Sequence, residues 1–154
     1  KGEYALAQEF LIRAAALSPG QPEIFKNLGN VCLLQNKEAQ AERAYLQALA
    51  LAPAYLYVHS VLGDMYLKNG ELEKAVAHFS EILIYEPDDP RVHNSLGAIY
   101  IKKADLRRAV YHFREALRID PSYASARNNL EFVLSQSAFS REGGGDLITG
   151  ESGE

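Results

Sequence analysis

The chain has one cysteine, no tryptophan and no long apolar run among its 154 residues. Because a single cysteine cannot form an internal disulfide, Cys32 is expected to serve only in core packing. Crossing a bilayer takes about 20 consecutive apolar residues, and the chain has neither such a run nor a signal-peptide pattern. We therefore expect no direct insertion into a membrane.

Positive charge is scarce as well. The formal net charge is −4, and residues 140–154 contribute −3 of it, because one arginine there faces four acids: Arg141 against Glu142, Asp146, Glu151 and Glu154. The rest of the chain has almost balanced charge, without the strongly basic surface that contacts to nucleic-acid phosphates require. We expect no nucleic-acid partner.

Motifs for catalysis and for cofactors are also missing. The sequence has no phosphate-binding glycine loop, no zinc-ligand cluster and no nucleophile with a placed base. His59 and His93, like His78 and His112, are 34 residues apart. Equivalent positions of stacked helical repeats lie about 10 Å or more apart, too far to share a metal at bond lengths of about 2 Å. We predict no enzyme activity, no metal and no cofactor.

What the chain does contain is a repeat of 34 residues. Prolines and glycines recur at that spacing, as Pro19, Pro53, Pro87 and Pro121 and as Gly29, Gly63 and Gly97. A period of this length is typical of stacked two-helix units, which hold other molecules more often than they transform them.

Apolar and small residues follow the same register. The first helix of each pair has Leu28, Leu62, Leu96 or Leu130, followed four residues later by Cys32, Tyr66, Tyr100 or Leu134. The second helix has Ala7, Ala41, Ala75 or Ala109, then Leu11, Tyr45, Phe79 or Phe113, then Ala14, Ala48, Ile82 or Ala116. These spacings place each set on one buried helical face. We expect the glycine of the first helix and the alanine of the second to let the two backbones cross closely.

Turn residues separate the two helices of a pair. Gly2, Asn36 and Gly70 share one register, and both residue types tolerate the left-handed conformation that ends a helix. Ala104 breaks this rule, so its turn should be tighter or slightly strained. Acidic residues follow at once, where the start of a helix favours negative charge, and each proline then ends the second helix.

These residues resemble the tetratricopeptide repeat family. The matching sets are Leu28, Gly29, Ala41, Tyr45, Ala48 and Pro53; Leu62, Gly63, Tyr66, Ala75, Phe79, Ile82 and Pro87; and Leu96, Gly97, Tyr100, Ala109, Phe113, Ala116 and Pro121. The resemblance implies an all-α, right-handed superhelical solenoid of antiparallel helix pairs. One family position, often a tryptophan, is here Phe25, His59, His93 or Arg127.

The register sets the expected boundaries. A repeat domain should cover 1–139, with a half repeat over 1–20, in which a lone second helix runs from Glu3 to Leu17. Full repeats follow over 22–54, 55–88 and 89–122, and a capping helix over 123–139. Glu131 stands where a following helix would need glycine, which marks the cap. The acidic, glycine-rich tail over 140–154 is expected to be disordered unless it finds a surface.

A second stripe on the first helices faces away from the leucine and tyrosine columns. In proteins of the family it resembles, this stripe lines a concave groove that holds an extended peptide or a partner helix. The predicted peptide-binding residues are Lys26, Asn30, Tyr57, Ser60, Asp64, Lys68, Arg91, Asn94, Lys102 and Asn128. Asparagine offers both donors and acceptors to a ligand backbone. The lysines and arginine outnumber Glu23 and Asp64, which favours an acidic ligand or a terminal carboxylate.

The family's carboxylate clamp for the acidic ends of chaperones is a sharper version of this prediction. Lys26 and Asn30 match its first pair, and Arg91 matches a basic residue of the third repeat. Val61 stands where the clamp requires asparagine, and Ser95 replaces another basic residue. Chaperone binding of that kind is therefore disfavoured.

Three functions remain open at this stage. The favoured one is a non-catalytic protein-interaction module. The others are a docking or regulatory arm of a larger enzyme, whether membrane-bound or not, and a self-assembly scaffold that associates through the first helix or the tail. The start in mid-repeat at Lys1 indicates a soluble fragment of a longer protein, with the cytoplasm as the expected compartment. We also expect Asp146–Glu154 to rest on a concave surface, and the Ala7 and Leu11 face to make an apolar contact.

Overall fold

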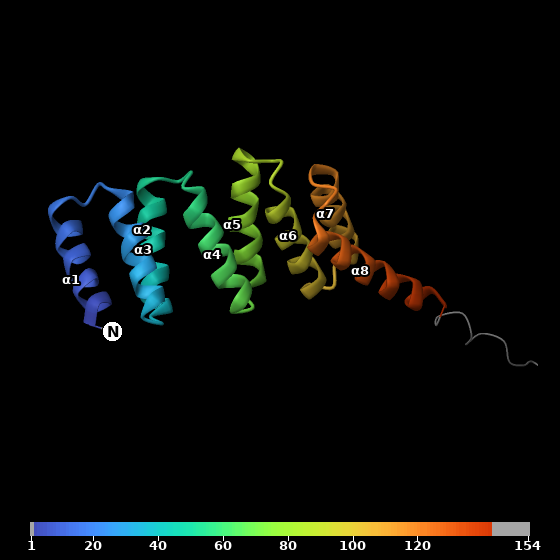
Figure 1. Ribbon diagram of the computed structural model, residues 1–154, viewed down its shortest axis with the longest axis horizontal. Coiled ribbons are helices and arrows are strands. Elements are labelled where there is room, and N and C mark those ends of the chain that lie inside the picture. Colours follow the sequence, from blue (N-terminus) through green and yellow to red (C-terminus); the bar gives the residue numbers. More distant parts are fainter. Residues whose placement is uncertain (1, 143–154) are drawn as a thin grey trace, which may run out of the picture. The chain divides into compact units, whose positions relative to one another are not determined.

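The computed structural model describes residues 2–142, and the regular structure of this range is entirely helical (Figure 1). The helices are α1 (Gly2–Leu17), α2 (Pro22–Leu34), α3 (Glu38–Leu51), α4 (Leu56–Lys68), α5 (Leu72–Tyr85), α6 (Pro90–Lys102), α7 (Leu106–Ile119) and α8 (Ala124–Glu142). The last helix thus runs three residues past the predicted end at Phe139. The prediction for Asp146–Glu154 lies outside the described residues.

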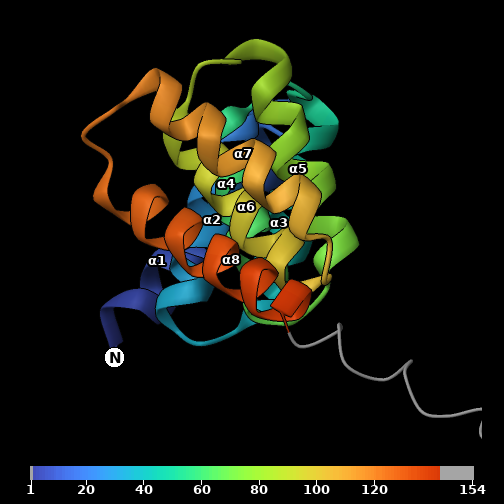
Figure 2. The ribbon, with the colours of Figure 1, turned by 90° about the vertical axis from the view of Figure 1, so that its right-hand side faces the viewer.

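The chain forms two compact units, residues 1–85 and 86–154. Unit 1 contains α1 to α5, in which α2 packs on α3 and α4 packs on α5. Unit 2 contains α6 to α8, in which α6 and α7 form a pair and α8 packs against both (Figure 2). In each pair the even-numbered helix is the first helix and the odd-numbered helix is the second.

The turn inside each pair contains one left-handed residue, as predicted. Its φ angle is 58° at Asn36, 78° at Gly70 and 57° at Ala104. An L-residue with a side chain in this region is strained by about 1–2 kcal/mol, so the Ala104 turn keeps the geometry of the others at a cost. Asp105 then caps α7, because its side chain accepts a hydrogen bond from the backbone N–H of Arg108 at 3.0 Å.

The core of each unit is built from the predicted columns. Its fully or almost fully buried side chains include Cys32, Ala41, Tyr45, Ala48, Leu62, Ala75, Phe79 and Ile82 in unit 1, and Leu96, Ala109, Phe113 and Ala116 in unit 2. Cys32 is a free buried thiol whose pKa is raised by burial, which agrees with the packing role expected for it.

The repeated glycines lie against aromatic rings of the second helices. The three atoms nearest to the place of a Cβ at Gly29 belong to the ring of Tyr45, and the same is true of Gly63 with Phe79 and of Gly97 with Phe113. The glycine therefore makes room for the aromatic ring that follows the small alanine by four residues. The close crossing of the two backbones at glycine and alanine stays a prediction, and the atoms nearest to the glycine belong to the ring.

Helix α1 is less covered than the other second helices. None of its residues is buried, and Ala7 and Leu11 are half-buried, whereas the equivalent Ala41 and Tyr45 are inaccessible. The described residues include no first helix to pair with α1, which contacts α2 instead. Large apolar side chains are consequently exposed on it, among them Leu6, Phe10 and Leu17.

Candidate functional site

The ten predicted peptide-binding residues all lie on first helices and fall into two sets. Unit 1 has Lys26 and Asn30 on α2 and Tyr57, Ser60, Asp64 and Lys68 on α4. Unit 2 has Arg91, Asn94 and Lys102 on α6 and Asn128 on α8. We refer to them as the unit 1 face and the unit 2 face.

Asn30 is held in one orientation on the unit 1 face. Its Oδ1 accepts hydrogen bonds from the hydroxyls of Tyr45, at 2.6 Å, and Tyr57, at 3.1 Å. Burial raises the pKa of Tyr45, so its hydroxyl stays protonated and remains a donor. The Asn30 acceptor is therefore occupied, and the side chain offers a ligand the N–H groups of Nδ2 only. This corrects the expectation that it would offer both donor and acceptor.

Both lysines of the unit 1 face are already paired. Lys26 Nζ lies 2.7 Å from a carboxylate oxygen of Glu23 and 5.9 Å from the centre of the Tyr57 ring. Lys68 Nζ lies 2.5 Å from Oε1 of Glu38 at the start of α3. The hydrogen bond from Lys26 lowers the pKa of Glu23. A ligand carboxylate would have to compete with these acids.

Asp64 is the exception on this face. Its side chain is exposed, and it forms no ion pair with another residue of the described range. Burial by surrounding protein atoms nevertheless raises its pKa.

The unit 2 face repeats this pattern. Arg91 donates from Nε and Nη2 to the two carboxylate oxygens of Asp89, at 3.2 and 2.9 Å. Burial alone would raise the pKa of Asp89, but hydrogen bonds from the Arg91 side chain and from the helix start hold it below its usual value. Asn94 Oδ1 accepts from Nδ2 of Asn129 at 3.0 Å, so one of its two acceptor sites is engaged and its Nδ2 has donors to spare.

Lys102 and Asn128 complete the unit 2 face. Both are exposed, and neither has a polar partner within the part of the chain that the structure describes. Of the four cations counted in the sequence, Lys102 is thus the one with an uncompensated charge. Formal charge could not show this, because the partners of the other three include Glu38 and Asp89, which lie outside the predicted stripe.

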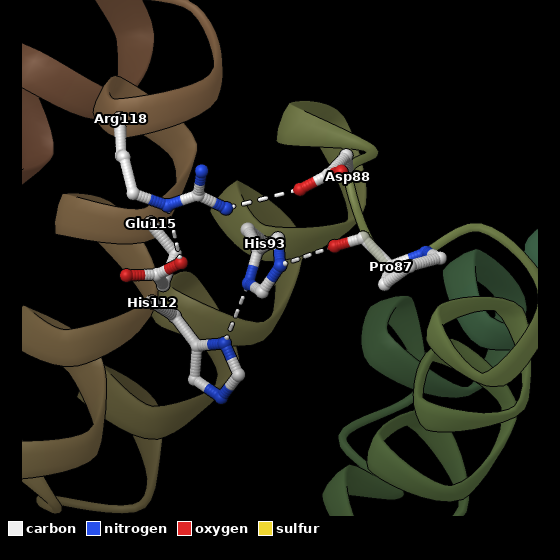
Figure 3. A network of polar contacts seen from close by, with 6 residues as sticks. All are labelled: Pro87, Asp88, His93, His112, Glu115 and Arg118. Atoms are coloured by element: carbon white, nitrogen blue, oxygen red, sulfur yellow. Dashed lines mark hydrogen bonds and ion pairs between the residues drawn. The ribbon is translucent and has the colours of Figure 1, made fainter.

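Two contacts between histidines were not predicted from the sequence. In unit 2, Nδ1 of His93 lies 3.1 Å from Nδ1 of His112, and Nε2 of His93 lies 3.1 Å from the carbonyl oxygen of Pro87 (Figure 3). In unit 1, His59 makes the same two contacts with His78 and Pro53, at 3.0 and 2.9 Å. The histidines that meet are 19 residues apart, one on each helix of a pair. They are therefore not the histidines one period apart that the repeat pattern relates to each other.

The contacts define the protons on these pairs. A carbonyl oxygen only accepts, so the Nε2 of His93 carries hydrogen, and the Nδ1 of a neutral His93 then accepts from His112. Burial and the neighbouring His93 lower the pKa of His112 to about 4, and burial and His59 lower that of His78. His112 is therefore neutral near pH 7. The ring of Tyr100 stacks on that of His112, and the ring of Tyr66 stacks on that of His78. The ring centres are 5.4 Å apart in both contacts.

A hydrogen bond to the proline carbonyl explains which residues occupy the positions equivalent to His59 and His93. Arg127 donates from Nη2 to the oxygen of Pro121 at 2.5 Å, which is the contact that His59 and His93 make with their own prolines. In the first full repeat the histidine positions are Phe25 and Ala44, an apolar version of the same site. Within the described residues no three histidine, cysteine or acidic side chains converge on a metal site, and a structural role accounts for the pairs.

Three family models, each described as tetratricopeptide repeat, match residues 1–56, 39–99 and 90–123. A comparison with curated protein sequences finds no match. No helix among the residues described is both long and apolar enough to span a bilayer.

Solved structures with a similar fold include MamA from Desulfovibrio magneticus RS-1, with 19% identity and a TM-score of 0.78 over 95% of this chain and 89% of that one. A tetratricopeptide repeat protein from Parabacteroides merdae has 24% identity and a TM-score of 0.81, over 92% of this chain and 58% of that one. The Sgt2 TPR domain from Aspergillus fumigatus has 19% identity and a TM-score of 0.69, over 86% and 89%. At these identities the likeness shows the fold alone.

Proposed function

The chain belongs to the tetratricopeptide repeat family, and from that premise we propose that it is a non-catalytic module that binds an extended polypeptide on the faces of its first helices. Helix repeats of this kind serve generally in protein–protein interaction. The unit 1 and unit 2 faces are the surfaces that we assign to this role.

The orientation of two asparagines carries the proposal. Asn30 and Asn94 come from equivalent helices, and in each the carboxamide oxygen is engaged within the protein while Nδ2 has donors to spare. A side chain fixed in this way loses little rotational freedom when it binds. On each face, such a donor suits a carbonyl oxygen of an extended main chain.

An acidic preference is the finer part of the proposal. Lys102 is exposed and unpaired, and Arg91 keeps most of its side chain exposed, at 80%, although it holds Asp89. A ligand carboxylate beside either of these residues, which lie at opposite ends of α6, would gain charge-assisted hydrogen bonds. Asp64 would repel such a ligand on the unit 1 face, so we assign the acidic ligand to the unit 2 face.

The test removes the asparagine donors and keeps the acceptors. In the variant Asn30→Asp with Asn94→Asp, Oδ1 still accepts from the tyrosines and from Asn129, but Nδ2 is gone. The control variant, Asn27→Asp with Asn69→Asp, adds the same charge at two exposed positions outside the stripe. Both are compared with the unaltered chain against ten-residue peptides that this chain selects from a degenerate displayed library.

We expect the selected peptides to be rich in acidic residues, to bind the control variant as they bind the unaltered chain, and to bind the donor-free variant at least tenfold more weakly. Equal binding to all three proteins, or a library that yields no binders, would refute the proposed function.

Self-assembly is a second candidate, because of the bare face of α1. Leu6 and Phe10 are 54% and 58% exposed, and they occupy the positions of Lys74 and His78, which contact the first helix of their pair. Sedimentation of the unaltered chain and of the variant Leu6→Gln with Phe10→Gln, at increasing concentration, tests this. Self-assembly predicts a mass that grows with concentration in the first protein and stays at that of a monomer in the second.

A further inference from the structure

Positive charge is concentrated in one short part of this acidic chain. Residues 102–118 contain six lysines and arginines against two acids, a net charge of +4, although the whole chain has −4. Most of this stretch is α7, the second helix of unit 2. Lys102 at the end of α6 belongs to the unit 2 face. Helix α7 lies outside the two faces assigned above, which come from first helices.

One side of α7 carries an exposed row of arginines and a tyrosine. Arg107, Tyr111, Arg114 and Arg118 follow at intervals of three or four residues, which places them on one helical face, and all four are exposed. We call them the arginine stripe. The opposite side of α7 is buried through Ala109, Phe113 and Ala116, so the stripe is free of the fold's own packing.

Two of the arginines have no partner among residues 2–142. Arg118 is engaged by Glu115 at 2.9 Å and by Asp88 at 3.0 Å (Figure 3). Arg107 and Arg114 make no hydrogen bond or ion pair with any residue in the described range. Tyr111, between them in sequence, is 57% exposed and meets the ring of His112 edge-on at 5.1 Å. The stripe therefore has two unsatisfied guanidinium groups beside a supported aromatic ring.

The fold does not require these residues. The equivalent positions of α5, one period earlier, are Glu73, Ala77, Ser80 and Ile84. The same helix thus forms with a quite different outer side, and the arginine stripe is a property of unit 2 alone.

An apolar hollow adjoins the stripe. It lies between α7 and α8 and is lined by Leu106, Arg107, Val110 and Val133. Unit 1 has a hollow at the equivalent place between α3 and α4, but its lining includes Glu38 and Glu42, which are held by Lys68 and by the hydroxyl of Tyr66. Unit 2 has leucine and valine at those two places, so its hollow can accept an apolar side chain.

We propose that the arginine stripe and the adjoining hollow form a second docking surface, whose partner is an acidic polypeptide segment with an apolar side chain as anchor. Guanidinium groups bind carboxylates through two parallel hydrogen bonds, and Tyr111 supplies contact area between them. The stripe is a single row of about 16 Å, from eleven residues at the rise of a helix, which matches another helix or strand. A flat lipid surface would leave the hollow unfilled.

The test replaces exposed residues of α7 by the residues at the equivalent positions of α5. The variant Arg107→Glu, Tyr111→Ala, Arg114→Ser carries residues that the equivalent helix already tolerates, and circular dichroism checks that it folds. The control Arg43→Glu changes charge in the same direction at an exposed arginine on α3. The probe is a pool of nine-residue peptides with blocked ends, four fixed glutamates and degenerate apolar positions, added to the full isotope-labelled chain.

We expect saturable shifts of the amide signals of α7 and of α8 near Val133, at least tenfold weaker binding by the triple variant, and unchanged binding by Arg43→Glu. Binding should also survive in Asn30→Asp with Asn94→Asp, which separates this surface from the proposed function. No shifts at millimolar peptide, shifts confined to first helices, or equal binding by the triple variant would overturn the proposal. So would cosedimentation with phosphatidylserine vesicles in the absence of any peptide binding, since the surface would then belong to a membrane.

Discussion

Gly97 lies directly against the ring of Phe113, so that a Cβ atom at residue 97 would come within 2.5 Å of Cε1 of that ring. The ring is completely buried and cannot move aside without disturbing the α6–α7 pair. The same contact joins Gly29 to Tyr45 and Gly63 to Phe79. The aromatic residue of the second helix is therefore the reason for the glycine in the first.

Replacing Gly97 by alanine should destabilise unit 2. Overpacking of a filled core costs roughly 1–3 kcal/mol, which exceeds the gain of up to about 1 kcal/mol from alanine's better helix propensity. Unfolding by urea measures the loss. Gly20→Ala serves as the control, because nothing lies within 4 Å of its Cβ position. In Gly97→Ala with Phe113→Leu, part of the loss should be recovered; equal stability of Gly97→Ala and the unaltered chain would contradict the role of the ring.

Ala104→Gly should stabilise the chain. Ala104 has a φ of 57°, and glycine adopts this conformation without strain because it has no Cβ. We expect a gain of about 0.5–1 kcal/mol, because some of the relieved strain is offset by the greater freedom of glycine in the unfolded chain. Differential scanning calorimetry would show a higher Tm. Ala98→Gly, inside α6, should act in the opposite direction, and a fall in Tm for both variants would disprove the strain at Ala104.

Mild acid should weaken unit 2 through its histidine pair. The pKa of His112 is about 4 in the folded protein, whereas an unperturbed histidine has about 6.5. The unfolded chain therefore binds the proton first, and stability falls as pH drops from about 6.5 towards 4. Glu115 opposes and Arg108 reinforces the lowered pKa. We expect a loss on the order of 1–2 kcal/mol at pH 5 relative to pH 7.5 from this group.

The apolar version of the site provides the control for this prediction. The variant His93→Phe with His112→Ala reproduces the pair Phe25 and Ala44. Urea unfolding at the two pH values should show a smaller difference for this variant than for the unaltered chain. An NMR titration in which His112 protonates near pH 6.5 would rule the explanation out.

Asp89→Ala should cost about 1–2 kcal/mol. The Asp89 carboxylate is almost buried and accepts hydrogen bonds from the backbone N–H groups of Arg91 and Val92, at 2.8 and 3.4 Å, where α6 begins. Because its folded pKa is lowered, this stabilisation is present above about pH 4 and is lost as pH falls further. Asp88→Ala, at the exposed neighbour that meets Arg118, should change the urea midpoint far less. A comparable effect of the two substitutions would exclude the cap.

The bounds of the helices could be predicted closely from the sequence because the same residue pattern recurs in each repeat. Stripe, turn and proline agree at every period, so an atypical residue such as Ala104 did not mislead the prediction. The partner of each glycine could not be predicted, since Ala75 and Phe79 lie on the same buried side of α5 and only the crossing geometry decides which one comes closest. Nothing in one sequence measures that crossing.

The candidate faces were less accessible to sequence reasoning. The period assigns Asn30 and Lys26 to a face, but it does not say which of their polar atoms are already engaged. Tyr45 reaches Asn30 from the second helix, and Glu38 reaches Lys68 from another repeat. The histidine pairs escaped notice for a similar reason. The two histidines of a pair stand at different positions of the repeat. A comparison of equivalent positions in successive repeats therefore does not relate them to each other.

The engaged carboxamide oxygens of Asn30 and Asn94 have a consequence for selectivity. On each face, an asparagine whose Nδ2 has donors to spare recognises a carbonyl oxygen, and every residue of every polypeptide has one. Such a surface would hold many different sequences with similar strength, so discrimination among ligands would fall to the few uncompensated charges, Asp64 and Lys102.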